Sequence, residues 1–182
     1  MSVQGLLRSP LLVLTVPFVC LNAALVVQNR ELKASRQPAH ALLPALGTKI
    51  SKLDGVGLDG ARVSVLFPAD GAKTVLFVFS TTCRVCDLNW PAWQGIVDSL
   101  NHRSYRVVYA NIHSSLSSAY LTERGVLGGI LFADLDPHSV VALNLGLTPL
   151  TVLLGRDGAV EEVWAGLLEG DELAGVRETL SR

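Results

Sequence analysis

The chain contains few cysteines, with only three in 182 residues. Cys83 and Cys86 form a C-x-x-C pair, and the third, Cys20, lies far away in an apolar N-terminal segment. A structural zinc site usually needs four ligands, commonly a second C-x-x-C or two closely spaced histidines. The sequence argues against structural zinc because its histidines are scattered; they are His40, His102, His113 and His138.

An excess of charge of one sign is also lacking, since 15 basic and 16 acidic residues leave a net charge of −1. No basic stripe runs through the sequence, so nothing indicates binding to nucleic acid. Internal repeats and low-complexity segments are absent as well. A chain of this length holds one domain and little more.

The C-x-x-C pair follows directly after residues 75–79, which are apolar at every position. This pattern predicts a strand that ends near the cysteines and turns into a helix, which is the layout of a dithiol/disulfide redox site. Two cysteines three apart in the first helical turn lie on one face, so their sulfurs can form a short-loop disulfide. The positive end of the helix dipole favours the thiolate of Cys83, and the thiolate is the nucleophile.

Residues 11–27 form an apolar run without charge, broken only by Thr15, Pro17 and Asn22. This run is a local cause of the high hydrophobic content of the chain, 49%. Its length is near the lower limit for crossing a bilayer, about 17–25 residues. We expect an uncleaved transmembrane anchor at 11–27, preceded by a short tail at 1–10 and followed by a polar linker at 28–47.

A cleaved signal peptide and a buried helix are the alternatives for this apolar run. Asn22-Ala23-Ala24 supplies a poor A-x-A-like cleavage site. Cys20 invites a lipoprotein interpretation, but Pro17-Phe18-Val19 before it lacks the small residues that such processing needs.

Charge and chemistry favour opposite orientations of the anchor. Arg8 flanks one end, whereas Arg30, Lys33 and Arg36 flank the other, and this weakly favours a C-terminal domain in the cytoplasm. A membrane tether offers little advantage to a cytosolic dithiol protein. Outside the cytoplasm, a tether keeps such a protein close to membrane-bound electron donors or acceptors. We therefore expect a single-pass protein of the bacterial inner (cytoplasmic) membrane whose catalytic domain faces the periplasm.

The remaining residues, 48–182, predict one α/β domain. Asp59-Gly60 indicates a hairpin turn before a strand at 62–67. Strands alternating with helices imply a partly parallel sheet with helices on both faces. The second helix is expected to be capped by Ser114 or Ser115, and the third to end at Gly146. The expected strands are 75–79, 105–110, 130–132, 150–154 and 159–164, and the expected helices 83–101, 114–124, 137–145 and 169–180.

Four sequence features stand out within this domain: the hairpin at 58–63, the segment 79–86 followed by Pro91, Thr148-Pro149 opening a strand, and the turn at 156–158. Together they resemble thioredoxin-fold proteins of the membrane-anchored TlpA/ResA type, including the related MauD-like proteins. The resemblance covers roughly residues 48–182. It implies a thioredoxin-like fold, a central mixed β-sheet flanked by helices, with an N-terminal β-hairpin extension.

The resemblance also implies roles for residues outside the cysteine pair. In this family the proline at the position of Pro149 is cis, faces the C-x-x-C pair, and leaves a neighbouring backbone free to pair with an extended substrate segment. By carry-over, the Thr148–Pro149 bond is cis. Thr82, Thr148 and Pro149 are the implied substrate-binding residues.

The sequence departs from the family where a proton acceptor for the second cysteine is expected. The buried Asp of thioredoxin corresponds to Phe77, and the buried Glu of some ResA-like proteins to Ser114. Thr82 stands where thioredoxins have Trp. His113 is the candidate proton shuttle, because an imidazole exchanges protons near neutral pH. The alternative for His113 is a solvent-facing loop residue.

The expected activity is thiol–disulfide exchange, in which Cys83 attacks a substrate disulfide and Cys86 resolves the mixed disulfide. Arg84 and Val85 tune the reduction potential. No metal is expected, and no cofactor besides the redox-active disulfide. The expected partners are protein disulfides or dithiols and a membrane electron donor or acceptor. These residues do not fix the direction of electron flow; family frequency favours a reductase, for example in cytochrome c or enzyme maturation.

A copper-binding assembly factor is the alternative from another class, with the two cysteines and His113 or His138 on Cu(I), which favours thiolates. Thioredoxin-fold copper chaperones carry C-x-x-x-C and a specific distal histidine, so the spacing here argues against this function. A peroxiredoxin would need Pro-x-x-x-Thr-x-x-Cys, but Leu76 and Ser80 occupy those positions. A scaffold with vestigial cysteines would not normally keep both sulfurs and the Thr-Pro loop.

Overall fold

The computed structural model describes residues 22, 25–26, 43–68, 71–126 and 128–181. The predicted N-terminal tail, almost all of the predicted anchor and most of the predicted linker lie outside the described residues. Within the described part of the chain, no helix combines the length and the apolar character needed to span a membrane. The folded domain falls within residues 42–182.

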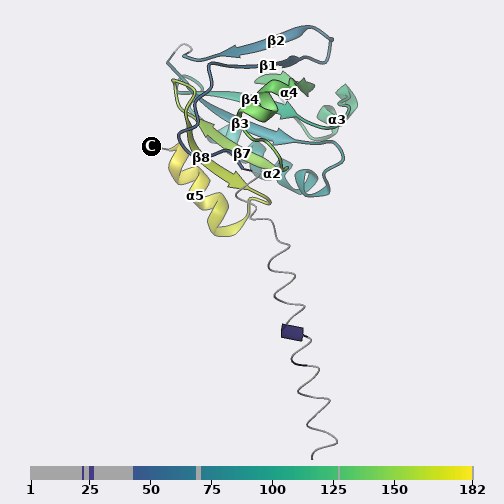
Figure 1. Ribbon diagram of the computed structural model, residues 1–182, viewed down its shortest axis with the longest axis vertical. Coiled ribbons are helices and arrows are strands. Elements are labelled where there is room, and N and C mark those ends of the chain that lie inside the picture. Colours follow the sequence, from purple (N-terminus) through teal and green to yellow (C-terminus); the bar gives the residue numbers. More distant parts are fainter. Residues whose placement is uncertain (1–21, 23–24, 27–42, 69–70, 127, 182) are drawn as a thin grey trace, which may run out of the picture. The chain divides into compact units, whose positions relative to one another are not determined.

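A five-stranded mixed sheet forms the centre of this domain (Figure 1). Strands β3, β4 and β5 are parallel, whereas β7 and β8 are antiparallel to their neighbours. Every residue of β3 after Lys73 is buried, which explains its continuous apolar run: both faces of the strand are covered. In sheet order the strands are β5 (Ile130–Phe132), β4 (Tyr105–Asn111), β3 (Lys73–Phe79), β7 (Leu150–Leu154) and β8 (Val160–Ala165).

The two faces of the central sheet carry separate apolar clusters. Alternate β3 side chains divide between them: Phe77 belongs to the cluster beneath α2 and α5, and Leu76 to the cluster beneath α4 and the β1–β2 hairpin. This arrangement confirms the predicted α/β fold with a mixed sheet and an N-terminal hairpin. The covering elements are α2 (Arg84–Ser99), α3 (Ser118–Glu123), α4 (Pro137–Ala142), α5 (Gly170–Leu180), β1 (Lys52–Val56) and β2 (Arg62–Leu66).

The N-terminal hairpin belongs to a second sheet, in the order β2-β1-β6. Strand β1 pairs antiparallel with β2 through the predicted turn at Asp59-Gly60, and with β6 (Asp134–Leu135) on its other side. Strand β6 has no counterpart among the strands that the sequence predicts. A strand of two residues is too short to show a periodic pattern, and it is far from β1 in the sequence, so nothing indicates their pairing.

The packed domain begins before residue 48, the predicted start. The Gly47 N–H donates to the Val160 carbonyl at 2.8 Å, and the Asn144 side-chain amide donates to the Leu43 carbonyl at 2.9 Å. Leu43 also packs against the apolar cluster beneath α4. Residues 43–47, predicted as the end of the linker, therefore contact the domain.

Two helices, α3 and α4, differ from their predicted bounds by at least three residues at one end. Helix α3 begins at Ser118 because Ser117, and not Ser114 or Ser115, is its N-cap: the Ser117 hydroxyl accepts the Tyr120 N–H at 3.3 Å. Helix α4 ends at Ala142, before the predicted stop at Gly146. Asn144 takes the left-handed conformation, with φ of 51°, and this ends the helix.

Candidate active site

The two cysteines lie at the start of α2. Cys83 is the N-cap residue, and Cys86 lies in the first turn. Their Cα atoms are 5.3 Å apart and their sulfurs form a disulfide with a Cβ–S–S–Cβ dihedral of 87°. The structure thus brings together the pair that the sequence analysis predicts as the redox site.

Exposure distinguishes the two sulfur-bearing residues. Cys86 is completely buried, whereas Cys83 is half-buried. The Cys83 Sγ also accepts the Cys86 N–H at 3.1 Å. A sulfur at this position in the reduced protein receives both a backbone donor and the positive end of the helix dipole, which stabilise a thiolate. Cys83 is therefore the better-placed nucleophile, and the roles of Cys83 as attacking and Cys86 as resolving cysteine stay predictions.

The loop before the cysteines is held by short polar contacts. The Cys83 N–H donates to the Ser80 carbonyl at 3.0 Å, and the Ser80 and Thr82 hydroxyls lie 3.0 Å apart. Thr82 is exposed, as a substrate-contacting residue must be, but its predicted role stays a prediction. Arg84 and Val85 are exposed as well, and their effect on the potential also stays a prediction.

A neutral polar network stands where the sequence analysis looks for a proton acceptor. The Ser114 hydroxyl accepts the Thr81 N–H at 2.9 Å and donates to the Asn111 side chain at 2.7 Å. Asn111 is completely buried and donates to the Ser114 and Ala133 carbonyls. This network fixes the cysteine loop to the end of β4, but it contains no group that titrates near neutral pH.

Among the described residues, no buried carboxylate could serve as the proton acceptor, because each described Asp and Glu is exposed or half-buried. Phe77, at the position of the thioredoxin Asp, is completely buried, and its ring packs 5.2 Å from Trp93 and 5.4 Å from Tyr109. Burial raises the pKa of Tyr109 to about 12, so its hydroxyl stays protonated at neutral pH. Cys86 therefore lies in a cluster of apolar and neutral side chains that includes Phe77, Trp93 and Tyr109.

His113, the candidate proton shuttle, is an exposed residue at the end of β4 with φ of 59°. Among the described residues, no hydrogen bond joins it to either cysteine or to the loop before them. Its exposure agrees with the solvent-facing alternative, and its role as a shuttle stays a prediction.

The Thr148–Pro149 peptide bond is cis, as the resemblance implies. Pro149 is buried and Thr148 is half-buried. The Pro149 carbonyl accepts the Gly166 N–H at 3.0 Å, which joins the segment to the end of β8. The predicted contacts of Thr148 and Pro149 with substrate stay predictions.

An ion pair beside the cysteines was missed by the sequence analysis. Asp87 directly follows Cys86, and its carboxylate accepts from the Arg124 guanidinium at 2.6 and 2.9 Å. Tyr120 donates to the same carboxylate at 3.1 Å, since burial raises its pKa and keeps the hydroxyl protonated. Arg124 also lies 3.6 Å from the centre of the Tyr120 ring. The negative charge next to the redox pair is therefore matched by a positive one.

Replacing Arg124 by Gln should make reduced Cys83 less reactive, because the unpaired Asp87 carboxylate then disfavours the nearby thiolate. An exposed ion pair contributes about 0.2–1 kcal/mol, so we expect alkylation to slow by about 1.4- to fivefold at neutral pH and the pH–rate profile to shift to higher pH. The measurement is the alkylation rate of the reduced chain against pH.

The matched control is Arg124→Gln combined with Asp87→Asn, which removes both charges and should restore the native profile. Added salt should shrink the difference between Arg124→Gln and the native chain, because both side chains are partly exposed. An unchanged profile in Arg124→Gln would show that the ion pair does not act on Cys83.

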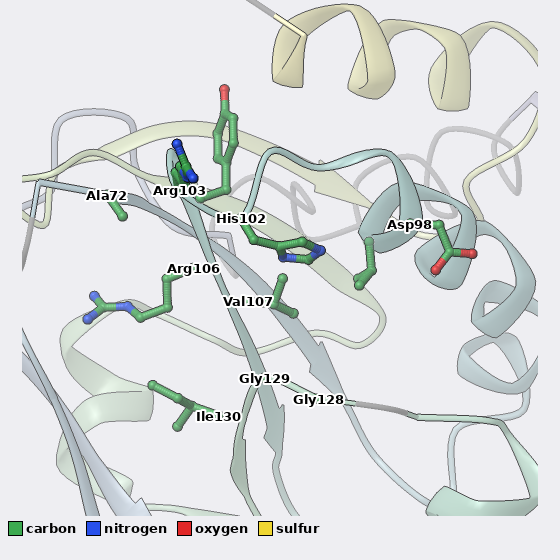
Figure 2. A pocket seen from close by; sticks show the side chains of 11 residues that line it. Ala72, Asp98, His102, Arg103, Arg106, Val107, Gly128, Gly129 and Ile130 are labelled. Atoms are coloured by element: carbon green, nitrogen blue, oxygen red, sulfur yellow. The ribbon is translucent and has the colours of Figure 1, made fainter.

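A cavity of about 580 Å³ lies elsewhere in the domain, where β4 begins and α2 ends. Figure 2 shows Asp98, His102 and Arg106 around it. The cysteines follow the end of β3, and β3 and β4 are parallel, so this cavity is at the opposite end of the sheet. Arg106 donates to the Thr74 hydroxyl at 2.9 and 3.1 Å, which supports a structural role for it.

A copper site would need further metal ligands beside the two cysteines. Within the described ranges, no group of three or more His, Cys, Asp or Glu residues could hold a metal ion. His138 lies in α4, which packs on the other face of the sheet from the α2 cluster. The copper alternative thus finds no support in the arrangement of these side chains.

The architecture and the placement of the disulfide define a thioredoxin-like fold. Among solved structures, a thiol:disulfide interchange protein of the thioredoxin family from Chlorobium tepidum has a TM-score of 0.57 and 20% identity, over 75% of this chain and 97% of that chain. A DsbF homologue from Corynebacterium diphtheriae has a TM-score of 0.59 and 19% identity, over 72% and 86%. The thioredoxin domain of a thiol-disulfide oxidoreductase from Bacteroides vulgatus has a TM-score of 0.57 and 16% identity, over 75% and 98%.

At these identities the likeness shows the fold, and the activity must be argued from this chain's own residues. No protein family matches the chain. No curated protein matches it either.

Proposed function

We propose that this chain is a thiol–disulfide oxidoreductase that reduces disulfides of extracytoplasmic client proteins from a membrane anchor, in the manner of TlpA/ResA-type proteins. The observation that carries the activity is the Cys83–Cys86 disulfide at the start of α2, with Cys83 half-buried and Cys86 buried. A helix N-terminus, an accessible sulfur and a second sulfur within bonding distance are what dithiol exchange requires.

Both steps of the proposed exchange transfer electrons between sulfur atoms of the chain and the client, so no added cofactor is needed. The Cys83 thiolate attacks one sulfur of the client disulfide, forms a mixed disulfide and releases the other client sulfur as a thiolate. The Cys86 sulfur attacks the Cys83 sulfur, which forms Cys83–Cys86 and breaks the mixed disulfide; the second client sulfur leaves and takes up the proton that Cys86 gives up. The client gains two electrons, and a dithiol electron donor protein must return two electrons to the chain.

One observation and one functional argument support the membrane and extracytoplasmic parts of the proposal. Residues 11–27 are apolar and uncharged over a length that can cross a bilayer. A tethered dithiol protein outside the cytoplasm also lies within reach of a membrane-bound electron donor.

The reduction potential of Cys83–Cys86 in the full-length chain tests the direction of electron flow. We expect a value near that of thioredoxin, about −270 mV, measured by equilibration against a defined thiol/disulfide buffer. A value near that of DsbA, about −120 mV, would contradict the reductase and make the chain a disulfide donor. Failure of the two sulfurs to exchange with the buffer would contradict the activity itself.

Labelling of Cys83 in intact cells tests the location. In a Cys20→Ser background, a membrane-impermeant maleimide added to cells after mild reduction should modify the chain without lysis. Labelling that requires lysis would place the domain in the cytoplasm and contradict the extracytoplasmic assignment.

A further inference from the structure

Asn89 is a completely buried polar residue on the helix that carries the cysteines. It lies one turn after Cys86, so both residues are on the same side of α2. Asparagine is a poor helix former, and a buried side-chain amide is costly unless both of its polar atoms are paired. Asn89 therefore requires an explanation that simple core packing does not give.

The connection between β8 and α5 satisfies both polar atoms of the Asn89 amide. Its Nδ2 donates to the Gly166 carbonyl at 2.8 Å, and its Oδ1 accepts the Leu168 N–H at 2.7 Å. These two bonds require one donor and one acceptor on a short side chain. Aspartate would set a carboxylate oxygen against the Gly166 carbonyl, and leucine would leave both backbone groups unpaired.

The same connection is joined to the cis-proline segment. The Gly166 N–H donates to the Pro149 carbonyl at 3.0 Å, directly beyond the pair Leu150 and Ala165 that begins the β7–β8 ladder. Asn89 thus connects the redox helix, through Gly166, to the residue that follows Thr148. Asn89 is 77 residues from Gly166 in the sequence, and Gly166 is 17 residues from Pro149.

We propose that Asn89 is a positioning residue: it fixes the place of the Thr148–Pro149 segment relative to the Cys83–Cys86 disulfide, and so aligns the backbone of a bound client with the attacking sulfur. The inference rests on the proposed function, since it assumes that Cys83 attacks client disulfides beside this segment. Asn89 should therefore matter for substrates with an extended backbone and not for small disulfides.

Two activated disulfides with one leaving group test this alignment. The first is an extended peptide whose single cysteine carries a 2-thiopyridyl group, and the second is cysteine itself with the same group. Both report attack by Cys83 through release of thiopyridone, and only the first offers a backbone that can pair beside Pro149. The full-length chain is used in its reduced form, with Cys20→Ser to remove the other thiol.

In the native chain, the peptide reagent should react about tenfold faster than the cysteine reagent, as two aligned hydrogen bonds of about 0.7 kcal/mol each would give. In Asn89→Leu this ratio should fall to about one, while the rate with the cysteine reagent stays within about twofold of native. Asn89→Ser, whose single hydroxyl can replace at most one of the two bonds, should give a ratio between those of the native chain and Asn89→Leu, and it covers the case in which Asn89→Leu does not fold.

Thr151→Val is the matched control for lost stability. The Trp93 indole N–H donates to the Thr151 hydroxyl at 2.9 Å, so this buried bond also joins α2 to β7, but neither residue bonds the Gly166 connection. We expect Thr151→Val to lower the free energy of unfolding and leave the ratio of the two rates at its native value. An equal loss of the ratio in Thr151→Val would reduce Asn89 to a general structural role.

The other outcomes separate this inference from the proposed function. A native ratio that persists in Asn89→Leu, or a native ratio of about one, would overturn the role of Asn89 while Cys83 still exchanges disulfides. Failure of native Cys83 to react with either reagent would instead overturn the proposed function.

Discussion

A Cys86→Ser variant should accumulate a mixed disulfide between Cys83 and its client, whereas Cys83→Ser should trap none. The accessible sulfur of Cys83 still attacks in the first variant, but the buried group that would displace the client is gone. Both variants should lose turnover by several orders of magnitude, as removal of a covalent nucleophile does. The measurement is a non-reducing gel of membranes from cells that express each variant.

Addition of a reductant should release the trapped client and identify it by mass. The double variant, Cys83→Ser with Cys86→Ser, is the control for adventitious capture, and Cys20→Ser in every chain removes the third thiol. Capture by Cys83→Ser alone would show that Cys86 is the attacking residue, against the order that the exposure of the two cysteines indicates.

Gly158→Ala is expected to be the most destabilising small change in the β7–β8 turn. Gly158 has φ of 82°, and an added Cβ would collide with the Ile50 carbonyl oxygen and come within 2.9 Å of the Phe67 Cβ. Left-handed strain of about 1–2 kcal/mol and overpacking of about 1–3 kcal/mol together predict a loss of about 2–5 kcal/mol. Urea unfolding of the purified chain measures it.

Gly60→Ala is the matched control, because Gly60 has φ of 77° but nothing lies within 4 Å of an added Cβ. It should lose only the strain, about 1–2 kcal/mol. Equal losses in the two variants would show that the domain relaxes around residue 158 and that Ile50 and Phe67 do not hold the turn tightly.

Local sequence signals were sufficient for the parts of the fold that depend on neighbours along the chain. The strand at 75–79 was predicted because it is apolar throughout, and burial on both faces explains that pattern. The redox pair was predicted because strand, cysteines and helix are contiguous. The cis bond before Pro149 was predicted only through the resemblance to a family.

Long-range pairing explains what the sequence did not predict. Asn89 and Gly166 are 77 residues apart, and Asp87 and Arg124 are 37 apart, so no spacing rule connects them. The predicted start of α3 was wrong because several nearby serines could cap the helix. The Ser114 hydroxyl is bonded to Thr81 and Asn111 and does not cap α3. Membrane anchoring and the roles of Thr82, Thr148 and His113 stay predictions.

The sulfur that we propose as the nucleophile, Cys83 Sγ, is also the N-cap of its helix. The Cys86 N–H donates to the Cys83 Sγ at 3.1 Å. A change in what this sulfur is bonded to should therefore change the chemical environment of the Cys86 amide proton. Oxidised, reduced and client-bound protein should therefore give three distinct chemical shifts for the Cys86 amide. Its exchange with deuterium should quicken when a client draws the sulfur away, because the first turn of α2 then loses its cap. The Cys86 amide signal would thus distinguish the three states of the proposed exchange reaction.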